Sequence, residues 1–145
     1  SILDLSLTLE YLETHGVPVL GYKTKELPAF YTRKSGFELD YNIQSAEEFA
    51  NILNAKWSLG LNGGVVIANP IPEEYSMDYD VITVAIENAL IEAEEKNIRG
   101  KQATPFLLGK IKEITGGSSL DANIALVFNN AKLASQIAIE LCKLG

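Results

Sequence analysis

The pattern of hydrophobic and polar positions predicts five helices. Apolar residues return every three or four positions, as on one face of an α-helix, over residues 2–13, 45–59, 78–96, 104–116 and 119–145. Local signals bound these helices: Ser1 is the expected first N-cap, Ser45 and Glu48 form a capping box, and Pro105 is expected at the first position of its helix. Glycines at 16 and at 116–117 suit helix ends.

Three shorter runs have the character of β-strands. Residues 17–22 alternate apolar and β-prone side chains, and residues 37–43 suggest a short edge strand. The run 65–68 is uninterruptedly apolar and ends abruptly at Asn69 and Pro70, which is typical of a buried central strand in a parallel sheet. Between the first two runs, residues 23–36 mix proline, aromatic and basic side chains without a period, which indicates a structured loop of the kind that often holds sites.

The helix over residues 78–96 has one apolar face and an acidic end. Its carboxylates at 92, 94 and 95 are interpreted as solvation rather than as a metal site, because clustered acids on a helix surface are ordinary. The expected buried face consists of Val81, Ile82, Ala85, Ile86, Ala89 and Leu90.

These elements indicate an α/β fold with fewer strands than its helices would normally cover. Five helices accompany two clear strands and one doubtful strand, whereas a doubly wound domain normally supplies four or more strands with helices on both faces. Bare sheet faces would leave apolar surface in water. The expectation is therefore that residues 1–145 are part of a larger unit.

Composition and charge narrow the function classes. The chain has 12 Lys+Arg against 19 Asp+Glu, a net charge of −7, which argues against partnership with nucleic acid or an anionic membrane. No apolar run approaches the length of a membrane span and no signal-peptide pattern opens the chain, so a cytoplasmic location is expected.

Three single residues are interpreted as structural. Cys142 is interpreted as a small buried hydrophobe, Trp57 as a core or interface anchor, and His15 as a partner of a helix C-terminus.

No self-contained catalytic motif is present in the sequence. There is no phosphate-binding loop, no spaced Cys/His metal set, and no serine in a nucleophile elbow. The polar groups at expected strand or helix ends are four asparagines, for which caps or turns remain alternatives to ligand contacts. They are Asn69, Asn123, Asn129 and Asn130.

A series of motifs along the whole chain resembles the pseudouridine-5′-phosphate glycosidase family, also called indigoidine synthase A-like. They are SILDL (1–5), EYLET (10–14), GVP (16–18), LPAF (27–30), ANPIPE (68–73), TPFLL (104–108), TGG (115–117) and NIALVFNN (123–130). The resemblance implies that residues 1–145 are the C-terminal half of one three-layer α/β/α domain with a mixed sheet, whose own N-terminal half supplies the remaining strands.

The resemblance also implies an activity, namely reversible cleavage of pseudouridine 5′-phosphate to uracil and ribose 5-phosphate with Mn²⁺. A C–C glycosidic bond offers no bridging oxygen to protonate, and the family is thought to hold the opened ribose as a Schiff base on a lysine. That lysine, the proton-donating glutamate, the metal-binding aspartate and the main phosphate contacts all precede Ser1, so no catalytic residue and no metal ligand is assigned to this chain.

Two residues are assigned to the substrate. Asn123 matches a family asparagine reported at the substrate, and its amide can both donate and accept hydrogen bonds to a uracil edge or a sugar hydroxyl. Asn69 is assigned from its expected position at a strand end, where ligands gather in parallel sheets. The resemblance further implies a homotrimer, with segments such as residues 30–34 near subunit contacts.

Two alternatives to this activity remain open from the sequence. One is a non-catalytic interaction module that kept the scaffold, and the other is a different sugar-phosphate C–C lyase on the same scaffold. A polypeptide near twice 15.8 kDa would favour the complete enzyme over the module.

Overall fold

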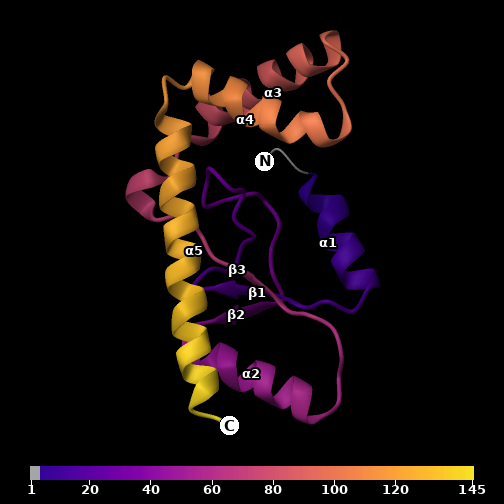
Figure 1. Cartoon of the computed structure of the whole chain (residues 1–145), viewed down its shortest axis with the longest axis vertical. Coiled ribbons are helices and arrows are strands. Elements are labelled where there is room, and N and C mark those ends of the chain that lie inside the picture. Colours follow the sequence, from indigo (N-terminus) through magenta and orange to yellow (C-terminus); the bar gives the residue numbers. More distant parts are fainter. Residues whose placement is uncertain (1–3) are drawn as a thin grey trace.

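The structure, a computed structural model, describes residues 4–145 and contains the five predicted helices and three predicted strands within them (Figure 1). Along the chain these are α1 (Leu5–Thr14), β1 (Val19–Tyr22), β2 (Tyr41–Ile43), α2 (Ala46–Ser58), β3 (Val66–Ala68), α3 (Tyr79–Glu95), α4 (Ala103–Ile114) and α5 (Ser118–Cys142). Two short 3₁₀ helices, Glu73–Tyr75 and Gly100–Gln102, precede α3 and α4.

The three strands form one parallel sheet in the order β2-β1-β3. The α/β class is therefore confirmed, and among residues 4–145 every strand pairing within the sheet is parallel. The edge position expected for residues 37–43 is confirmed for β2. The central position expected for residues 65–68 is wrong, because β1 is central and β3 lies at the other edge, where Val66 is 36% exposed. Within the described residues, the outer edge of β3 pairs with no strand.

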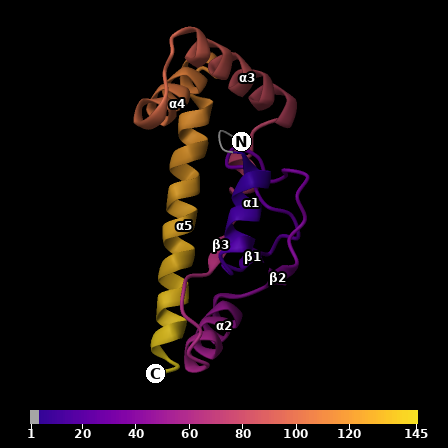
Figure 2. The same ribbon diagram turned by 90° about the vertical axis from the view of Figure 1, so that its right-hand side faces the viewer.

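Helices lie on both sides of the strands. Figures 1 and 2 place α5 on one side and α1 on the other, with α2 packed along the C-terminal part of α5. The predicted apolar face of α1 is only half-buried, since Leu5, Leu9 and Leu12 remain partly exposed and the helix fully buries no residue. Ile2 and Ser1 lie outside the described residues, and the N-cap of α1 is Asp4, whose Oδ1 accepts a hydrogen bond from the Leu7 amide.

Two hydrophobic clusters hold these elements together, and α5 contributes to both. The first joins α3, α4 and the N-terminal half of α5, where Ala122 and Leu126 are buried. The second joins β1, β2, α2 and the C-terminal half of α5, where Leu133 and Ile137 are buried. The helix is continuous over 25 residues, so one rigid element connects the two clusters.

The loop of residues 23–36 is structured, as expected. Tyr31 is 2% exposed in the first cluster, and this burial raises the pKa of its hydroxyl. Arg33 donates from Nη1 to the carbonyl oxygen of Ile71 at 2.5 Å. Glu26 accepts from the amides of Ser35 and Gly36, which closes the loop on itself. The loop is thus fixed against the segment that follows β3.

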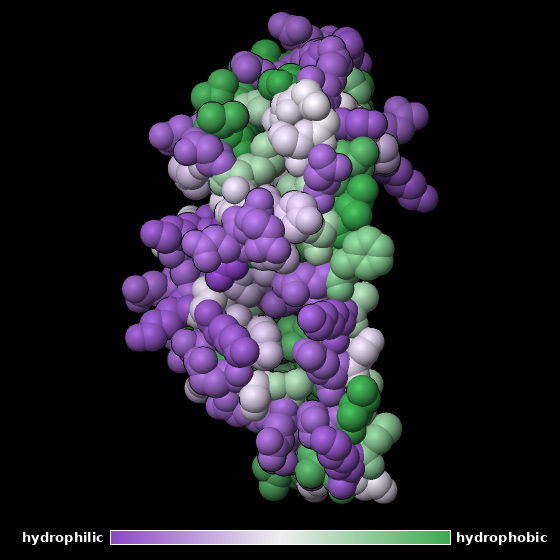
Figure 3. Space-filling view, turned by 90° about the vertical axis from the view of Figure 1, so that its left-hand side faces the viewer, coloured by the Kyte–Doolittle hydropathy of each residue, from purple (hydrophilic) through white to green (hydrophobic). Residues whose placement is uncertain are grey.

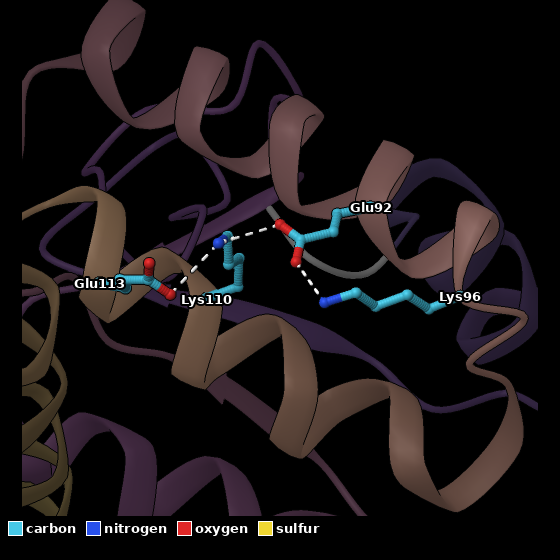
Figure 4. Close-up of polar contacts among 4 residues, drawn as sticks. All are labelled: Glu92, Lys96, Lys110 and Glu113. Atoms are coloured by element: carbon cyan, nitrogen blue, oxygen red, sulfur yellow. Dashed lines mark hydrogen bonds and ion pairs between the residues drawn. The ribbon is translucent and has the colours of Figure 1, made fainter.

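One acidic residue of α3 has a structural role that the sequence did not indicate. Glu92, expected to be only solvating, pairs with Lys96 at 2.6 Å and with Lys110 of α4 at 3.0 Å, and Lys110 also pairs with Glu113 at 3.2 Å (Figure 4). Hydrogen bonds from Lys96 and then Lys110 lower the pKa of the Glu92 carboxyl. Hydrogen bonds to Glu92 and then Glu113 raise the pKa of Lys110. Lys96 and Glu113 are largely exposed, and Glu92 and Lys110 are still partly reached by water, so the pairs orient α3 against α4 more than they stabilise the fold.

The helix boundaries follow the sequence signals closely. At the start of α2, Ser45 accepts from the Glu48 amide at 3.1 Å, so this half of the capping box is confirmed, and the Glu48 carboxylate reaches back one residue further, to the Gln44 amide. Pro105 is the third residue of α4 rather than the first, which costs nothing because the first-turn amides have no intrahelical partner. The His15 ring contacts the Tyr11 carbonyl oxygen at 2.9 Å at the end of α1, as expected.

Several hydrophobic side chains that the sequence placed in the core are exposed. Trp57 is 51% exposed, which contradicts a core position, and Cys142 is exposed at the end of α5. On α3, Ile82, Ala85, Ile86 and Ala89 are buried as expected, whereas Val81 and Leu90 are not.

The α5 side of the molecule carries a band of hydrophobic side chains (Figure 3). Exposed members on α5 are Leu120, Ile124, Val127, Phe128 and Ile139.

Gly21→Ala is expected to lower the free energy of unfolding by about 1 to 3 kcal/mol. Gly21 lies in the central strand, where a Cβ would overlap the backbone carbonyl of Thr24 and approach Leu39. Thermal unfolding followed by circular dichroism measures the change. Gly109→Ala is the matched control: it lies exposed in α4, a Cβ there meets nothing within 4 Å, and the same substitution should raise stability by about 1 kcal/mol. Equal shifts in both variants would contradict the close approach at Gly21.

Candidate substrate-binding site at the carboxyl end of β3

The candidate site begins where β3 ends. Asn69 follows the last residue of the strand directly, as expected, and is half-buried. Its Nδ2 donates a hydrogen bond to Oδ1 of Asn130, in the middle of α5, at 3.0 Å. Ligands of parallel α/β sheets bind at the carboxyl ends of strands, so this amide pair occupies the position where a substrate is expected.

A second asparagine fixes the backbone beside Asn69. Asn129 donates from Nδ2 to the carbonyl oxygen of Pro70 at 3.0 Å, and Pro70 is buried. Asn129 and Asn130 were left open as caps or turn formers. That alternative is wrong for both, since they lie inside the continuous helix α5 and their amides hold the segment 69–70 instead.

Asn123 also lies on α5, seven residues before Asn130. Seven residues make nearly two helical turns, so the two side chains leave almost the same face about 10 Å apart along the axis. Asn123 is half-buried, and its amide has no hydrogen-bond partner within residues 4–145. The structure thus places Asn123 and the Asn69–Asn130 pair along one side of α5, with the Asn123 amide available.

A groove of about 450 Å³ runs between β3, α2 and α5, with the amide pair as its polar part. Its remaining lining is apolar: Phe49, Ile67, Leu133, Ala134, Ile137, Ala138 and Leu141. A larger hollow of about 1140 Å³ lies between α1, β1, β2 and α2, and none of the four candidate asparagines lines it. Asn69 and Asn130 line the smaller groove, whereas Asn123 and Asn129 line neither of these two hollows.

The described residues supply few groups for acid–base or metal chemistry near these asparagines. No cluster of three or more His, Cys, Asp or Glu side chains that could hold a metal ion occurs among residues 4–145. His15 is at the end of α1, and Cys142 is at the far end of α5. What the site offers is hydrogen bonding by side-chain amides, which can position a ligand that carries both donors and acceptors. In the same residues, no helix is long and apolar enough to cross a bilayer.

Comparison with known proteins identifies the family of this chain. The model of the family described as "Indigoidine synthase A like protein" matches residues 1–140. The chain belongs to this family. It is 67% identical over all 145 residues to a protein of Clostridium botulinum and 56% identical over 145 residues to one of Escherichia coli, both named pseudouridine-5′-phosphate glycosidase. The chain spans about half the length of these relatives, 47% and 46% respectively.

Two solved structures of the family share the fold. The prealnumycin C-glycosynthase AlnA in complex with ribulose 5-phosphate superposes with a TM-score of 0.88 at 32% identity, over 99% of this chain and 47% of that protein. An indigoidine synthase A-like protein of Thermotoga maritima superposes with a TM-score of 0.85 at 40% identity, over 96% of this chain and 46% of that protein. This chain therefore adopts the α/β fold of indigoidine synthase A-like proteins.

Sequence reasoning missed the link between Asn69 and Asn130. The usable signal was the position of two adjacent asparagines in the middle of a helical apolar pattern, where asparagine has low helix propensity and needs a compensating contact. The pairing across 61 residues is a tertiary contact that periodicity cannot reveal.

Proposed function

We propose that this chain is the C-terminal half of a pseudouridine-5′-phosphate glycosidase, which reversibly cleaves the C-glycosidic bond of pseudouridine 5′-phosphate to give uracil and ribose 5-phosphate. The observation that carries this proposal is the 67% identity to the Clostridium botulinum pseudouridine-5′-phosphate glycosidase along the whole chain. Cleavage consumes one water, because a hydroxyl replaces uracil at C1′ of the ribose and a proton replaces the ribose on the uracil carbon.

The chain's own contribution is one wall of the pocket. Asn123 donates and accepts hydrogen bonds at the uracil edge or a sugar hydroxyl, and Asn69 adds a second amide from the end of β3. The lysine that forms a Schiff base with C1′ and withdraws electrons while the uracil carbon is protonated belongs to the other half of the polypeptide. The half-burial of Asn123, and an amide that bonds no other residue among 4–145, support a ligand contact there.

The other half of the same polypeptide is the proposed partner of the exposed apolar surface. One edge of β3 pairs with no strand of the described part of the chain, and the hydrophobic band on α5 includes Phe128 at 72% exposure. A monomer of this size rarely leaves such features in water. Relatives about twice as long supply a polypeptide that can cover them. Residues 1–145 are thus proposed to be half of a single domain rather than a domain.

The family assignment also leads us to propose a metal ion, an oligomeric state and a cellular location. The ligands of the expected Mn²⁺ are proposed to lie in the other half, as the resemblance to the family implies, and no step of the reaction is assigned to a metal held by this chain. The working enzyme is proposed to be a cytoplasmic homotrimer.

One alternative activity has an observation in its favour. The AlnA protein, at 32% identity, is named a C-glycosynthase and was solved with ribulose 5-phosphate, so a different sugar-phosphate C–C lyase or synthase on this scaffold is the second candidate. The greater identity to proteins named pseudouridine-5′-phosphate glycosidase favours the first candidate.

The test uses a completed enzyme, defined as this chain joined to the part of the Clostridium botulinum relative that lies outside the matched stretch. The completed enzyme is expected to release uracil from pseudouridine 5′-phosphate and at least a hundredfold less from uridine 5′-phosphate, whose N–C bond the same machinery does not address. Polar sites can discriminate between close analogues by about 10⁴-fold or more, so a hundredfold is a conservative threshold. Uracil is quantified chromatographically. Cleavage of neither nucleotide would overturn the assignment, and preference for uridine 5′-phosphate would identify an ordinary N-glycosidase.

A further inference from the structure

The hydrogen bond between Asn69 and Asn130 has a defined direction. Nδ2 of Asn69 donates and Oδ1 of Asn130 accepts, at 3.0 Å. Since the amide plane of Asn69 is then fixed by its partner, its own Oδ1 and its second N–H point elsewhere, and neither bonds another residue among 4–145. Without the acceptor on α5, the Asn69 amide could turn over and present the opposite groups.

The backbone of Asn69 is already fixed by other contacts. A residue that precedes proline is restricted to extended conformations, and here that proline is the buried Pro70. The carbonyl oxygen of Pro70 is in turn held by Asn129. The remaining freedom of Asn69 is therefore the rotation of its own side chain, and Asn130 is the residue that restrains it.

The position of Asn130 on α5 is fixed by the packing of the helix on both sides of it. It lies on α5 between two buried core residues, Leu126 one turn before it and Leu133 one turn after it, each packed in a different hydrophobic cluster. The hydrogen bond itself is exposed to water, and an exposed amide pair adds little to the stability of a fold. Its effect is to orient rather than to stabilise.

We propose that Asn130 is a positioning residue that sets the orientation of the Asn69 amide toward the substrate, so that α5 places both Asn123 and Asn69 from a single helix face. This role rests on the proposed function, in which Asn69 contacts pseudouridine 5′-phosphate. Asn130 itself need not touch the substrate.

Two variants of Asn130 test whether its side chain acts as a hydrogen-bond acceptor or only occupies volume. In the completed enzyme, Asn130→Leu removes the acceptor and should lower kcat/KM about fivefold, the value of one ordinary hydrogen bond. Asn130→Asp keeps an oxygen acceptor at the same position and should stay within about twofold of the wild type. Neither change should move the unfolding midpoint appreciably, because the side chain is exposed. Asn54→Leu, the same substitution at an exposed position of α2, is the matched control with unchanged kinetics.

A double-mutant cycle shows whether Asn130 acts through Asn69. Asn130→Leu is expected to have no further effect on kcat/KM in an Asn69→Ala background, whereas independent roles would add. Additive losses, an Asn130→Asp variant as impaired as Asn130→Leu, or wild-type kinetics of Asn130→Leu would each overturn the positioning role alone. A completed wild-type enzyme that is inactive on pseudouridine 5′-phosphate would instead overturn the proposed function, and this role with it.

Discussion

Residues 1–145 alone are expected to release no detectable uracil from pseudouridine 5′-phosphate, whereas the completed enzyme turns this substrate over. The physical reason is that the described residues offer amides for binding but no metal-binding cluster, and the Schiff-base lysine is proposed to lie in the other half. A loss of covalent catalysis removes many orders of magnitude of rate enhancement, on the scale of the 10⁶-fold or greater effects of enzymes. Uracil release is measured for both proteins at equal concentration.

The control for this result is reconstitution. The part of the Clostridium botulinum relative outside the matched stretch, added as a separate polypeptide, should restore activity if the two halves fold together. The outer edge of β3, which pairs with no described strand, and the apolar band on α5 would then be covered. Turnover by the isolated chain within tenfold of the completed enzyme would contradict the proposal that the catalytic residues lie in the other half.

Asn123→Ala in the completed enzyme is expected to lower turnover or substrate affinity at least tenfold. The substitution removes a donor and an acceptor from a half-buried position on α5, and a polar group of the substrate that loses its partner in a closed pocket costs about 1 to 3 kcal/mol. Steady-state kinetics with pseudouridine 5′-phosphate measure kcat and KM separately. Because the Asn123 amide bonds no other described residue, the unfolding midpoint should change little.

The comparison for this prediction is Asn129→Ala. Asn129 holds the Pro70 carbonyl oxygen, so its loss should lower the unfolding midpoint as well as activity. Near-wild-type kinetics of Asn123→Ala would remove Asn123 from the site. A drop in the Asn123→Ala midpoint as large as that of Asn129→Ala would make its role structural.

Local signals predicted the elements well because they depend on neighbouring residues. The Ser45 cap of α2 is an interaction within one turn, and the period of apolar residues that defines α5 is visible in the sequence. The same reasoning failed for the core alternative at Trp57 and for the burial of Val66, since both side chains are exposed within the described residues. The hydrophobic pattern of a sequence indicates which side chains are buried in the working protein. It does not indicate whether the same segment or another part of the polypeptide buries them.

The candidate site was predictable only in part for a related reason. Asn69 could be found at a strand end and Asn123 through a resemblance, since each is marked in the linear sequence. The amide pair of Asn69 and Asn130 joins segments 61 residues apart, and its existence depends on how α5 crosses the end of β3. Long-range hydrogen bonds of this kind are set by tertiary packing, which no local period encodes.

The continuity of α5 has a consequence for how the molecule unfolds. Its 25 residues extend about 37 Å, and its buried residues are shared between the α3–α4 cluster and the sheet cluster. Fraying at either end is local, but breaking the helix near Leu126 or Leu133 removes support from both clusters at once. The two clusters should therefore lose their amide protection against hydrogen exchange as a single cooperative unit, and the backbone amides of Asn129 and Asn130, in the middle of α5, should be protected to the same extent as those of the two clusters.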